Sequence, residues 1–367
     1  MTQKVMLVLL VLYKKKIMSY KVKIWNFMDL MKMYFDKKLN LNPPYQRNSI
    51  WSLQAQKLLI DTVKRDLPIP AFFIQEKEND SFEMVDGQQR TRALLGYIIE
   101  NGFTDKDSKK HVEGEFDNYE IAVNILSKDL PVEEVREFYV RVNKTGAKLE
   151  RPELNKAEFF DTNFLKLVTE LADLEQFKKL NLFSLSVKKR MFDRDFVEEL
   201  VALYLFGNVD KKKAVDKLFN EDIDNVKYNG IKKGFEEIIN IIYNLNEFID
   251  LSKTRYNQKN DFYTLFGLII KIKNISFPDL KLLFKNLVSI SEGVSPSNEN
   301  CEPLQEYAFN CITQSNSKKA RMKRLEITEK ILLNTNDKPN KVQKEIIKYF
   351  KLDSALKSVN KFHIVNI

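Results

Sequence analysis

Cysteine and histidine are scarce in this 367-residue chain, which has only two of each. Cys301 and Cys311 cannot build a disulfide framework and lack the spacing of metal ligands, so we expect a reducing, cytoplasmic compartment. With only His111 and His363 present, the sequence argues against a zinc site, a Ser-His-Asp triad, a Cys-His pair and a histidine-based (HNH) nuclease site. We therefore predict no metal site built from such residues.

Long apolar runs are also missing. The N-terminal run Val5–Leu12 falls far short of the ~20 residues that span a bilayer, and no small-residue cleavage site follows it. We expect a strand there, or a translated extension ahead of a start at Met18, so the sequence leaves open whether residues 1–17 belong to the protein. No membrane partner is predicted.

The composition is typical of a folded soluble protein with more than one domain. Hydrophobic residues make up 44% and charged residues 30% of the chain, and its length suits two domains. The net charge of +9 favours a polyanion partner such as nucleic acid. The alternative is a compositional habit, since Lys, Asn and Ile are all abundant.

Helix and strand patterns alternate up to about residue 150, and helical spacing then continues almost to the end. The first half predicts strands at 71–75, 82–85 and 120–126 and helices at 24–38, 53–64, 94–99 and 132–142. The second half predicts helices at 154–161, 164–177, 193–206, 215–219, 231–251, 262–271, 280–290, 302–313, 320–334 and 342–350. We therefore expect an α+β domain over residues 18–155 and an all-helical domain over residues 156–367.

The most informative motif is Asp86-Gly87-Gln88-Gln89-Arg90, which stands between a predicted strand and a predicted helix. Gly87 lets a ligand approach the backbone closely, and the N–H groups at a helix N-terminus can bind an anion. Asp86 can ligate Mg²⁺ or accept a proton from water, and the two glutamines can contact a base edge, a ribose or a water. We predict a hydrolytic pocket with Asp86, Gln88, Gln89 and Arg90 as its catalytic residues. A helix cap with a salt bridge is the structural alternative.

Two further segments contain side chains that could complete a phosphate site. Pro43 and Pro44 fix the backbone before Tyr45 and Arg47. The tyrosine ring can stack on a base and the arginine can pair with a phosphate. Asn, Lys and Thr at the end of the helix 132–142 could add to the cradle, although a helix C-cap would explain Gly146 equally well. The predicted substrate-binding and phosphate-binding residues are Tyr45, Gln46, Arg47, Gly87, Arg92, Asn143, Lys144 and Thr145.

A basic run lies near the start of a predicted helix in the second half. Its five cations are Lys318, Lys319, Arg321, Lys323 and Arg324. They cannot all pair within one helix, so several should face solvent and could contact a DNA backbone. The alternative is an ordinary solvated face.

These motifs together, in this order, resemble the N-terminal domain of GmrSD-type modification-dependent restriction endonucleases, which is related to the ParB and sulfiredoxin fold. The resemblance covers about residues 35–200. The matching segments are Pro44-Tyr45-Gln46-Arg47, Trp51-Ser52, Pro68-Ile69-Pro70, Asp86–Arg90, Asn143–Gly146, Glu153-Leu154-Asn155-Lys156-Ala157 and Lys189–Asp193. It implies a ParB/sulfiredoxin-like α+β domain and a prokaryotic, anti-phage defence role against modified foreign double-stranded DNA.

Three functions remain open at this stage. In the first, the Asp86 pocket hydrolyses a nucleoside triphosphate, with Mg²⁺ as the implied cofactor, and this reaction is coupled to recognition of modified DNA. In the second, the pocket receives a flipped modified base and Asp86 directs water to its glycosidic bond, which makes the protein a DNA glycosylase without a cofactor. In the third, the chain is a non-enzymatic DNA-binding regulatory module. The sequence does not identify the nucleotide or the DNA modification, and a homo-oligomer is compatible with all three.

Overall fold

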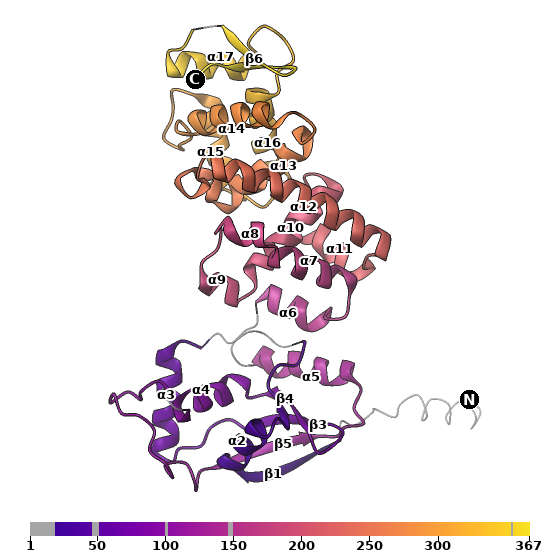
Figure 1. Ribbon diagram of the computed structural model, residues 1–367, viewed down its shortest axis with the longest axis vertical. Helices are drawn as coiled ribbons and strands as arrows, with labels where there is room; N and C mark the ends of the chain where they lie inside the picture. The colour runs from indigo at the N-terminus through magenta and orange to yellow at the C-terminus, as the bar shows by residue number, and fades with distance from the viewer. Residues whose placement is uncertain (1–18, 46–50, 100–101, 146–149, 354) are drawn as a thin grey trace, which may run out of the picture. The chain divides into compact units, whose positions relative to one another are not determined.

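The computed structural model describes residues 19–45, 51–99, 102–145, 150–353 and 355–367, without the side chains of residues 143–145. The chain forms two compact units, which divide between Glu158 and Phe159. The first, the α+β unit, contains a sheet and its helices, and the second, the helical unit, contains mainly helices (Figure 1).

The α+β unit is organised around a mixed five-stranded sheet with the order β1-β5-β3-β4-β2. Its strands are β1 (Tyr20–Asn26), β2 (Leu39–Asn40), β3 (Phe72–Glu76), β4 (Phe82–Asp86) and β5 (Glu120–Leu126). The pairs β1/β5 and β3/β4 are antiparallel, whereas β3/β5 and β2/β4 are parallel. The central strand β3 thus lies between β5 and the strand that leads into the Asp86 motif.

The described residues of this unit form five helices, and both faces of the sheet are covered. The helices are α2 (Phe27–Phe35), α3 (Leu53–Lys64), α4 (Gln88–Ile98), α5 (Val132–Thr145) and α6 (Arg151–Glu158). Side chains alternate between faces along a strand. Phe72 and Ile74 accordingly share a core with α2, α3 and α4, while Phe73 packs on Phe138 of α5 with ring centroids 5.0 Å apart.

Most of the strand and helix predictions for this unit are confirmed, but the first helix was wrong at its start. Residues 120–126 form β5 as predicted, and β4 extends the predicted strand 82–85 by one residue. Residues 24–26 belong to β1, because their backbone pairs with β5. The helix α2 begins only after Asn26, whose side chain accepts a hydrogen bond from the Met28 N–H at 2.7 Å and caps the helix.

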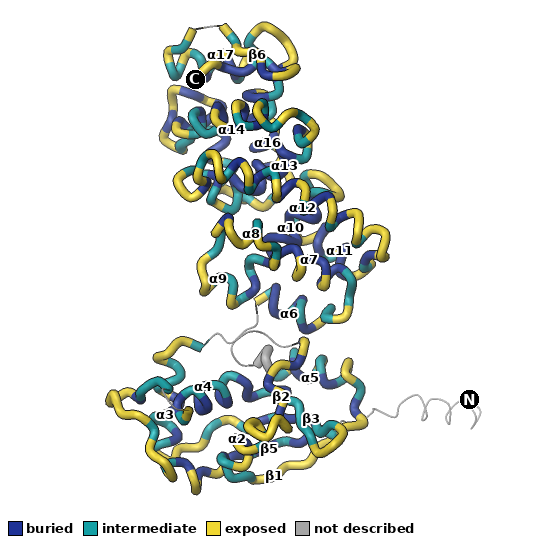
Figure 2. Tube along the Cα trace, in the orientation of Figure 1, coloured by how far each residue is buried: buried dark blue, intermediate teal, exposed yellow. Residues whose placement is uncertain are grey.

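The helical unit confirms the predicted change to helices. Its helices are α7 (Asn163–Asp173), α8 (Glu175–Lys179), α9 (Leu185–Lys189), α10 (Phe192–Phe206), α11 (Lys211–Glu221), α12 (Asn225–Phe248), α13 (Lys259–Ile272), α14 (Phe277–Ser291), α15 (Glu302–Ile312), α16 (Lys318–Leu332) and α17 (Lys341–Phe350), with short 3₁₀ turns at Leu251–Lys253 and Arg255–Asn257. All of these helices except α9 contribute buried residues or packed side chains to one hydrophobic core. The middle helices α10 and α13 are buried along most of their length (Figure 2).

The helical unit also contains a β-hairpin that the sequence patterns did not predict. Strands β6 (Leu356–Val359) and β7 (Phe362–Val365) pair antiparallel, and Phe362, Ile364 and Val365 join the core. Gln343 of α17 donates a hydrogen bond to the His363 carbonyl at 2.8 Å, which ties the hairpin to the helices. Within the ranges that the structure describes, no helix is long and apolar enough to cross a membrane.

Candidate active site

The candidate site is built on the turn that joins β4 to α4. Gly87 adopts the left-handed conformation there, with φ +111° and ψ −1°. A β-carbon at this position would lie 2.4 Å from Cδ1 of Phe72, so only glycine fits. The pairing of β3 with β4 also shifts register between Phe73 and Ile74, a bulge that alters the direction of the strand just before the turn. Backbone geometry therefore fixes the direction in which Asp86 leaves the sheet.

Arg90 ties this turn to the preceding strand entry. Its guanidinium donates to the Pro70 carbonyl at 2.8 Å and to the Ala71 carbonyl at 3.3 Å. Its Nη2, which also donates to Ala71, pairs with Oδ2 of Asp86 at 2.8 Å. The guanidinium lies 4.9 Å from the centre of the Phe72 ring. Burial lowers the pKa of Arg90, and Asp86 opposes that shift. Because Arg90 is only 7% exposed, its geometry suits a residue that positions Asp86 rather than one that binds a substrate.

Asp86 itself remains accessible. Its side chain is 29% exposed, and only Oδ2 is engaged by Arg90. Among the described residues no partner donates a hydrogen bond to its second oxygen, Oδ1. The structure thus presents one carboxylate oxygen in a fixed orientation that can accept a hydrogen bond from water or bind a cation.

The two glutamines of the motif hold a neighbouring segment. Gln88 is buried, and its amide donates to the Leu41 carbonyl. Gln89 accepts a hydrogen bond from the Trp51 N–H at 3.4 Å. These two contacts lie on either side of the segment that contains Gln46 and Arg47, both of which fall outside the described residues. The helix α4 therefore contacts the chain before and after the predicted binding residues Gln46 and Arg47.

Arg92 and Tyr45 add to this attachment. Arg92 donates through Nη2 to Oδ1 of Asn42, on the N-terminal side of the same segment. Tyr45 is buried; its hydroxyl donates to Oε1 of Glu83 at 3.1 Å, and its ring packs edge-on against Tyr139 of α5. Burial and the Glu83 carboxylate raise the pKa of Tyr45, so its hydroxyl stays protonated. The Tyr45 ring anchors the segment and is not free to stack on a base.

The predicted phosphate-binding residues Asn143, Lys144 and Thr145 lie at the end of α5. This helix continues past the predicted end at residue 142, so Asn143, Lys144 and Thr145 form its last turn. Their side chains fall outside the described residues. Phe138 and Tyr139, one to two turns earlier, pack on β3 and on Tyr45. The helix α5 therefore packs against β3, whose Phe73 pairs with Asp86 of β4 in the sheet.

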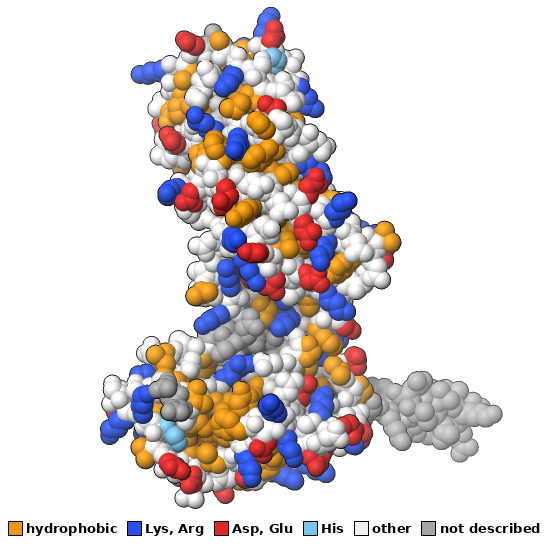
Figure 3. All heavy atoms as spheres, viewed as in Figure 1, with side chains coloured by type: hydrophobic (Ala, Val, Ile, Leu, Met, Phe, Trp, Pro, Cys, Tyr) orange, Lys and Arg blue, Asp and Glu red, His pale blue; other side chains and the backbone are white. Residues whose placement is uncertain are grey.

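The predicted DNA-binding run on α16 divides into two layers. Arg321 and Arg324 are 2% and 0% exposed. Contrary to the expectation, they are not part of a DNA-facing surface, because the helix turns them into the core. Lys318 and Lys319 are exposed, and Lys323 is half-buried and pairs with Glu306 at 3.1 Å. Figure 3 shows Lys and Arg interspersed with Asp and Glu over this unit, so the visible face presents no field of one sign.

Sequence reasoning missed three residues that shape the candidate site. Phe72 lies beneath Gly87 and Arg90, Glu83 accepts from Tyr45, and Tyr139 packs on Tyr45. Only Phe72 carried a signal, since it follows the Pro68-Ile69-Pro70 strand entry. The described part of the chain contains no group of three His, Cys, Asp or Glu side chains that could hold a metal ion.

Comparison with known proteins gives one match. Residues 29–160 match the family model described as GmrSD restriction endonuclease, N-terminal domain, which confirms the resemblance inferred from the motifs. The matched region contains the Asp86 turn and the segments attached to it, and it ends just inside the helical unit. No curated protein and no solved structure matches the chain. By its description, the matched model is the N-terminal domain of a restriction endonuclease.

Proposed function

We propose that this chain, whose α+β unit is an N-terminal domain of the GmrSD restriction endonuclease family, is an anti-phage defence hydrolase that acts at Asp86. In the version we favour, the site hydrolyses a nucleoside triphosphate, and this reaction is coupled to recognition of modified foreign DNA. The single observation that carries the proposal is the Asp86–Arg90 pair, which orients the carboxylate while one of its oxygens stays free.

The turn offers an anion its simplest binding site. The first N–H groups of a helix have no partner within the helix, and the N-cap of α4, Gly87, has no side chain to cap them. The absent β-carbon lets a phosphate approach those N–H groups. A phosphate bound there lies beside Asp86, whose free oxygen can then accept a proton from the attacking water.

The remaining predicted residues divide into anchors and ligands. Gln88, Gln89 and Tyr45 are engaged with Leu41, Trp51 and Glu83, so in this proposal they hold the site together. Arg92, which donates to Asn42, also acts as an anchor, and the ligand roles fall to Gln46, Arg47, Asn143, Lys144 and Thr145.

A magnesium ion fits this site only as a shared ion. Mg²⁺ keeps several waters and commonly binds one or two carboxylates together with substrate phosphates. The triphosphate and waters would supply its ligands, with Asp86 beside the ion as the proton acceptor, because no cluster of three acidic, histidine or cysteine side chains occurs among the described residues. The ion would neutralise phosphate charge.

The glycosylase alternative fits the geometry less well. Reading a flipped base requires free donors and acceptors that face its edge. The Gln88 amide donates to a backbone carbonyl, and the Gln89 carbonyl oxygen accepts from the Trp51 N–H. Both motif amides are thus engaged with the backbone, which favours a phosphate substrate.

The proposal is tested by phosphate release from nucleoside triphosphates with and without modified duplex DNA. We expect Asp86→Asn to lower the rate at least 100-fold, because the amide cannot accept a proton as the carboxylate does. Asp129→Asn, a change at an exposed acid of the same unit, is the matched control and should retain full activity. Equal rates for wild type and Asp86→Asn would overturn the proposal.

A further inference from the structure

The two buried arginines of α16 organise the turn that precedes the helix. Arg324 donates to the Asn310 carbonyl at 2.5 Å and to the Ser315 carbonyl at 2.9 Å, and so ties the end of α15 to the connecting turn. Arg321 pairs with Glu199 of α10, with Tyr263 stacked 4.1 Å from its guanidinium carbon. It also lies 3.5 Å from both the Val209 carbonyl and Oδ1 of Asn316. These contacts hold the turns before α11 and before α16 next to each other.

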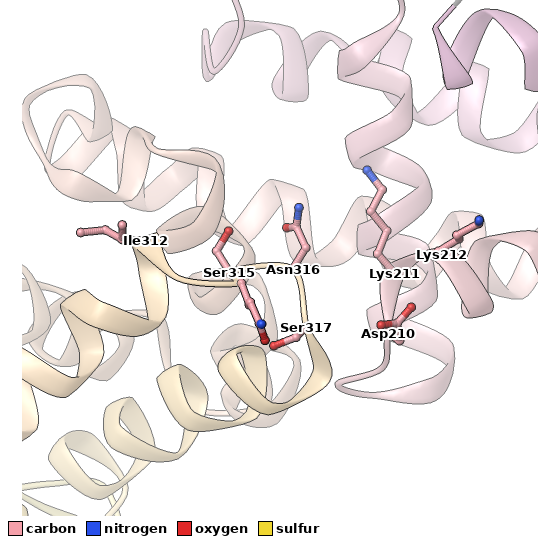
Figure 4. A pocket seen from close by; sticks show the side chains of 8 residues that line it. Asp210, Lys211, Lys212, Ile312, Ser315, Asn316 and Ser317 are labelled. Carbon is pink, nitrogen blue, oxygen red and sulfur yellow. The ribbon is translucent and has the colours of Figure 1, made fainter.

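The two turns line a hollow of about 500 Å³ (Figure 4). One side comes from the start of α11 and the other from the α15–α16 turn. The lining residues are Asp210, Lys211, Lys212, Ile312, Gln314, Ser315, Asn316 and Ser317. Apart from Asp210 and Ile312, every lining side chain is an amide, a hydroxyl or a lysine, all of which can donate a hydrogen bond.

A second hollow, of about 700 Å³, includes Lys318, which follows Ser317 of the first hollow in the sequence. It lies along α15 and α16 and is lined by Glu306, Asn310, Lys318, Lys319, Met322, Lys323 and Glu326. Ser317 lines the first hollow and Lys318 the second, so both hollows adjoin the start of α16. We call the residues lining both hollows the α16 surface.

The acids of the α16 surface are already engaged. Glu306 pairs with Lys323 at 3.1 Å, and Glu326 pairs with Lys330 at 2.5 Å. Asp210 accepts from the Lys213 N–H at 3.4 Å as the N-cap of α11. The carboxylates of the α16 surface are therefore either paired with a neighbouring lysine or bonded to a helix N-terminus.

Three of its lysines keep their charge available. Lys212, Lys318 and Lys319 are exposed, and none has an ion-pair partner within the described ranges. Lys211 differs, because it pairs with Asp195 and Glu199, at 2.6 Å in each case. Free lysines beside hydroxyl and amide donors are the groups that contact DNA phosphates.

We propose that the α16 surface binds the phosphate backbone of double-stranded DNA through Lys212, Lys318 and Lys319. Arg321 and Arg324 are positioning residues that hold the turn between α15 and α16. The inference rests on the proposed action on DNA and locates the contact in the helical unit. The contact is independent of base sequence, because lysine heads at phosphates read charge and not base edges.

The test is a salt titration of binding by the full chain to a labelled duplex. The variant is Lys212→Ala/Lys318→Ala/Lys319→Ala, and the matched control is Lys341→Ala/Lys344→Ala/Lys348→Ala, which removes three exposed lysines from α17. Losing three phosphate contacts should reduce the slope of log K against log salt by about 2.7 and weaken binding at 50 mM salt at least tenfold. The control should retain the wild-type slope.

Each contrary outcome has a definite meaning. If the Lys212→Ala/Lys318→Ala/Lys319→Ala variant bound DNA as the wild type does, with an unchanged slope, the α16 surface would not be the DNA contact. Absence of DNA binding by the wild type would equally overturn the proposal. Poly-glutamate that competes as well as duplex DNA at equal charge would overturn DNA as its partner. Phosphate release is measured on the same variants with and without modified duplex DNA and compared with that of Asp86→Asn, which reports on the Asp86 site. Lysine-dependent DNA binding without any hydrolysis would therefore overturn the proposed function and leave this surface standing.

Discussion

Arg90 of α4 pairs with Asp86 at the end of β4 at 2.8 Å, across the turn between them, and the same guanidinium donates to the carbonyls of Pro70 and Ala71. One buried side chain thus fixes both the candidate catalytic acid and the strand entry behind it. Removing it affects two properties, orientation and stability, which can be measured separately.

Replacing Arg90 with methionine should lower both stability and activity. The change leaves two carbonyls and a carboxylate without their donor, so we expect a loss of about 3 kcal/mol in the free energy of unfolding. Phosphate release should fall at least tenfold even under conditions where the variant is folded. Denaturant unfolding measures the first effect. Arg65→Met, at an arginine whose side chain is 63% exposed, should change stability by less than about 0.5 kcal/mol.

Gly87→Ala should destabilise the turn. The residue has φ +111°, and its new β-carbon would lie 2.4 Å from the Phe72 ring. Backbone strain and overpacking together should cost about 2–4 kcal/mol. The control is Gly96→Ala in the same helix, where the nearest atom, in the Phe103 ring, is 3.4 Å away. That change should be neutral or stabilise the protein by up to about 1 kcal/mol. Equal melting temperatures for the two variants would contradict this account of the turn.

A carboxylate cluster in the α+β unit predicts acid sensitivity. Lys64 contacts Asp105 at 2.6 Å and Glu115 at 2.7 Å. Burial alone would raise the pKa of both acids, but the Lys64 contacts, with other hydrogen bonds, lower the pKa of each below its usual value. Their stabilisation should therefore be complete above the unfolded-state pKa of about 4 and be lost as pH falls below it.

Thermal unfolding between pH 7 and pH 3 measures this dependence. In Lys64→Met the buried carboxylate of Asp105 loses its lysine and keeps only the N–H donors of Asp107 and Lys109, so its pKa should rise. The decline in stability towards acid should then become shallower or reverse. An unchanged profile in this variant would show that Lys64 does not set the acid response.

Buried and exposed cations of α16 should differ in their effect on stability when they are replaced. Arg321→Met removes one of three cations that pair with buried Glu199, leaving Lys211 and Lys259, and should cost about 1.5–3 kcal/mol. Lys319→Met changes an exposed residue and should alter stability by less than about 0.5 kcal/mol. Denaturant midpoints separate the two cases. A larger loss for Lys319→Met than for Arg321→Met would contradict the orientation of the helix.

Local sequence signals predicted the position of the candidate site but not its internal contacts. A glycine between a strand pattern and a helix pattern was enough to locate the Asp86 turn. The partners of Gln88 and Gln89 come from Leu41 and Trp51, about 40 residues earlier, and no local pattern specifies such pairs.

The basic run shows a signal that was present but not used. Arg321, Leu325, Thr328 and Leu332 recur at helical spacing, and all four are buried. That spacing could have predicted an inward-facing Arg321. Its partner, Glu199, comes from α10, more than 100 residues away, and required the structure.

The central claim is most directly tested by mass spectrometry of one reaction mixture that contains the purified chain, a nucleoside triphosphate, Mg²⁺ and modified duplex DNA. The account predicts that orthophosphate and nucleoside diphosphate accumulate, that Asp86→Asn abolishes both, and that no free base is released. Release of a free base without nucleotide turnover, or turnover that persists in Asp86→Asn, would contradict it.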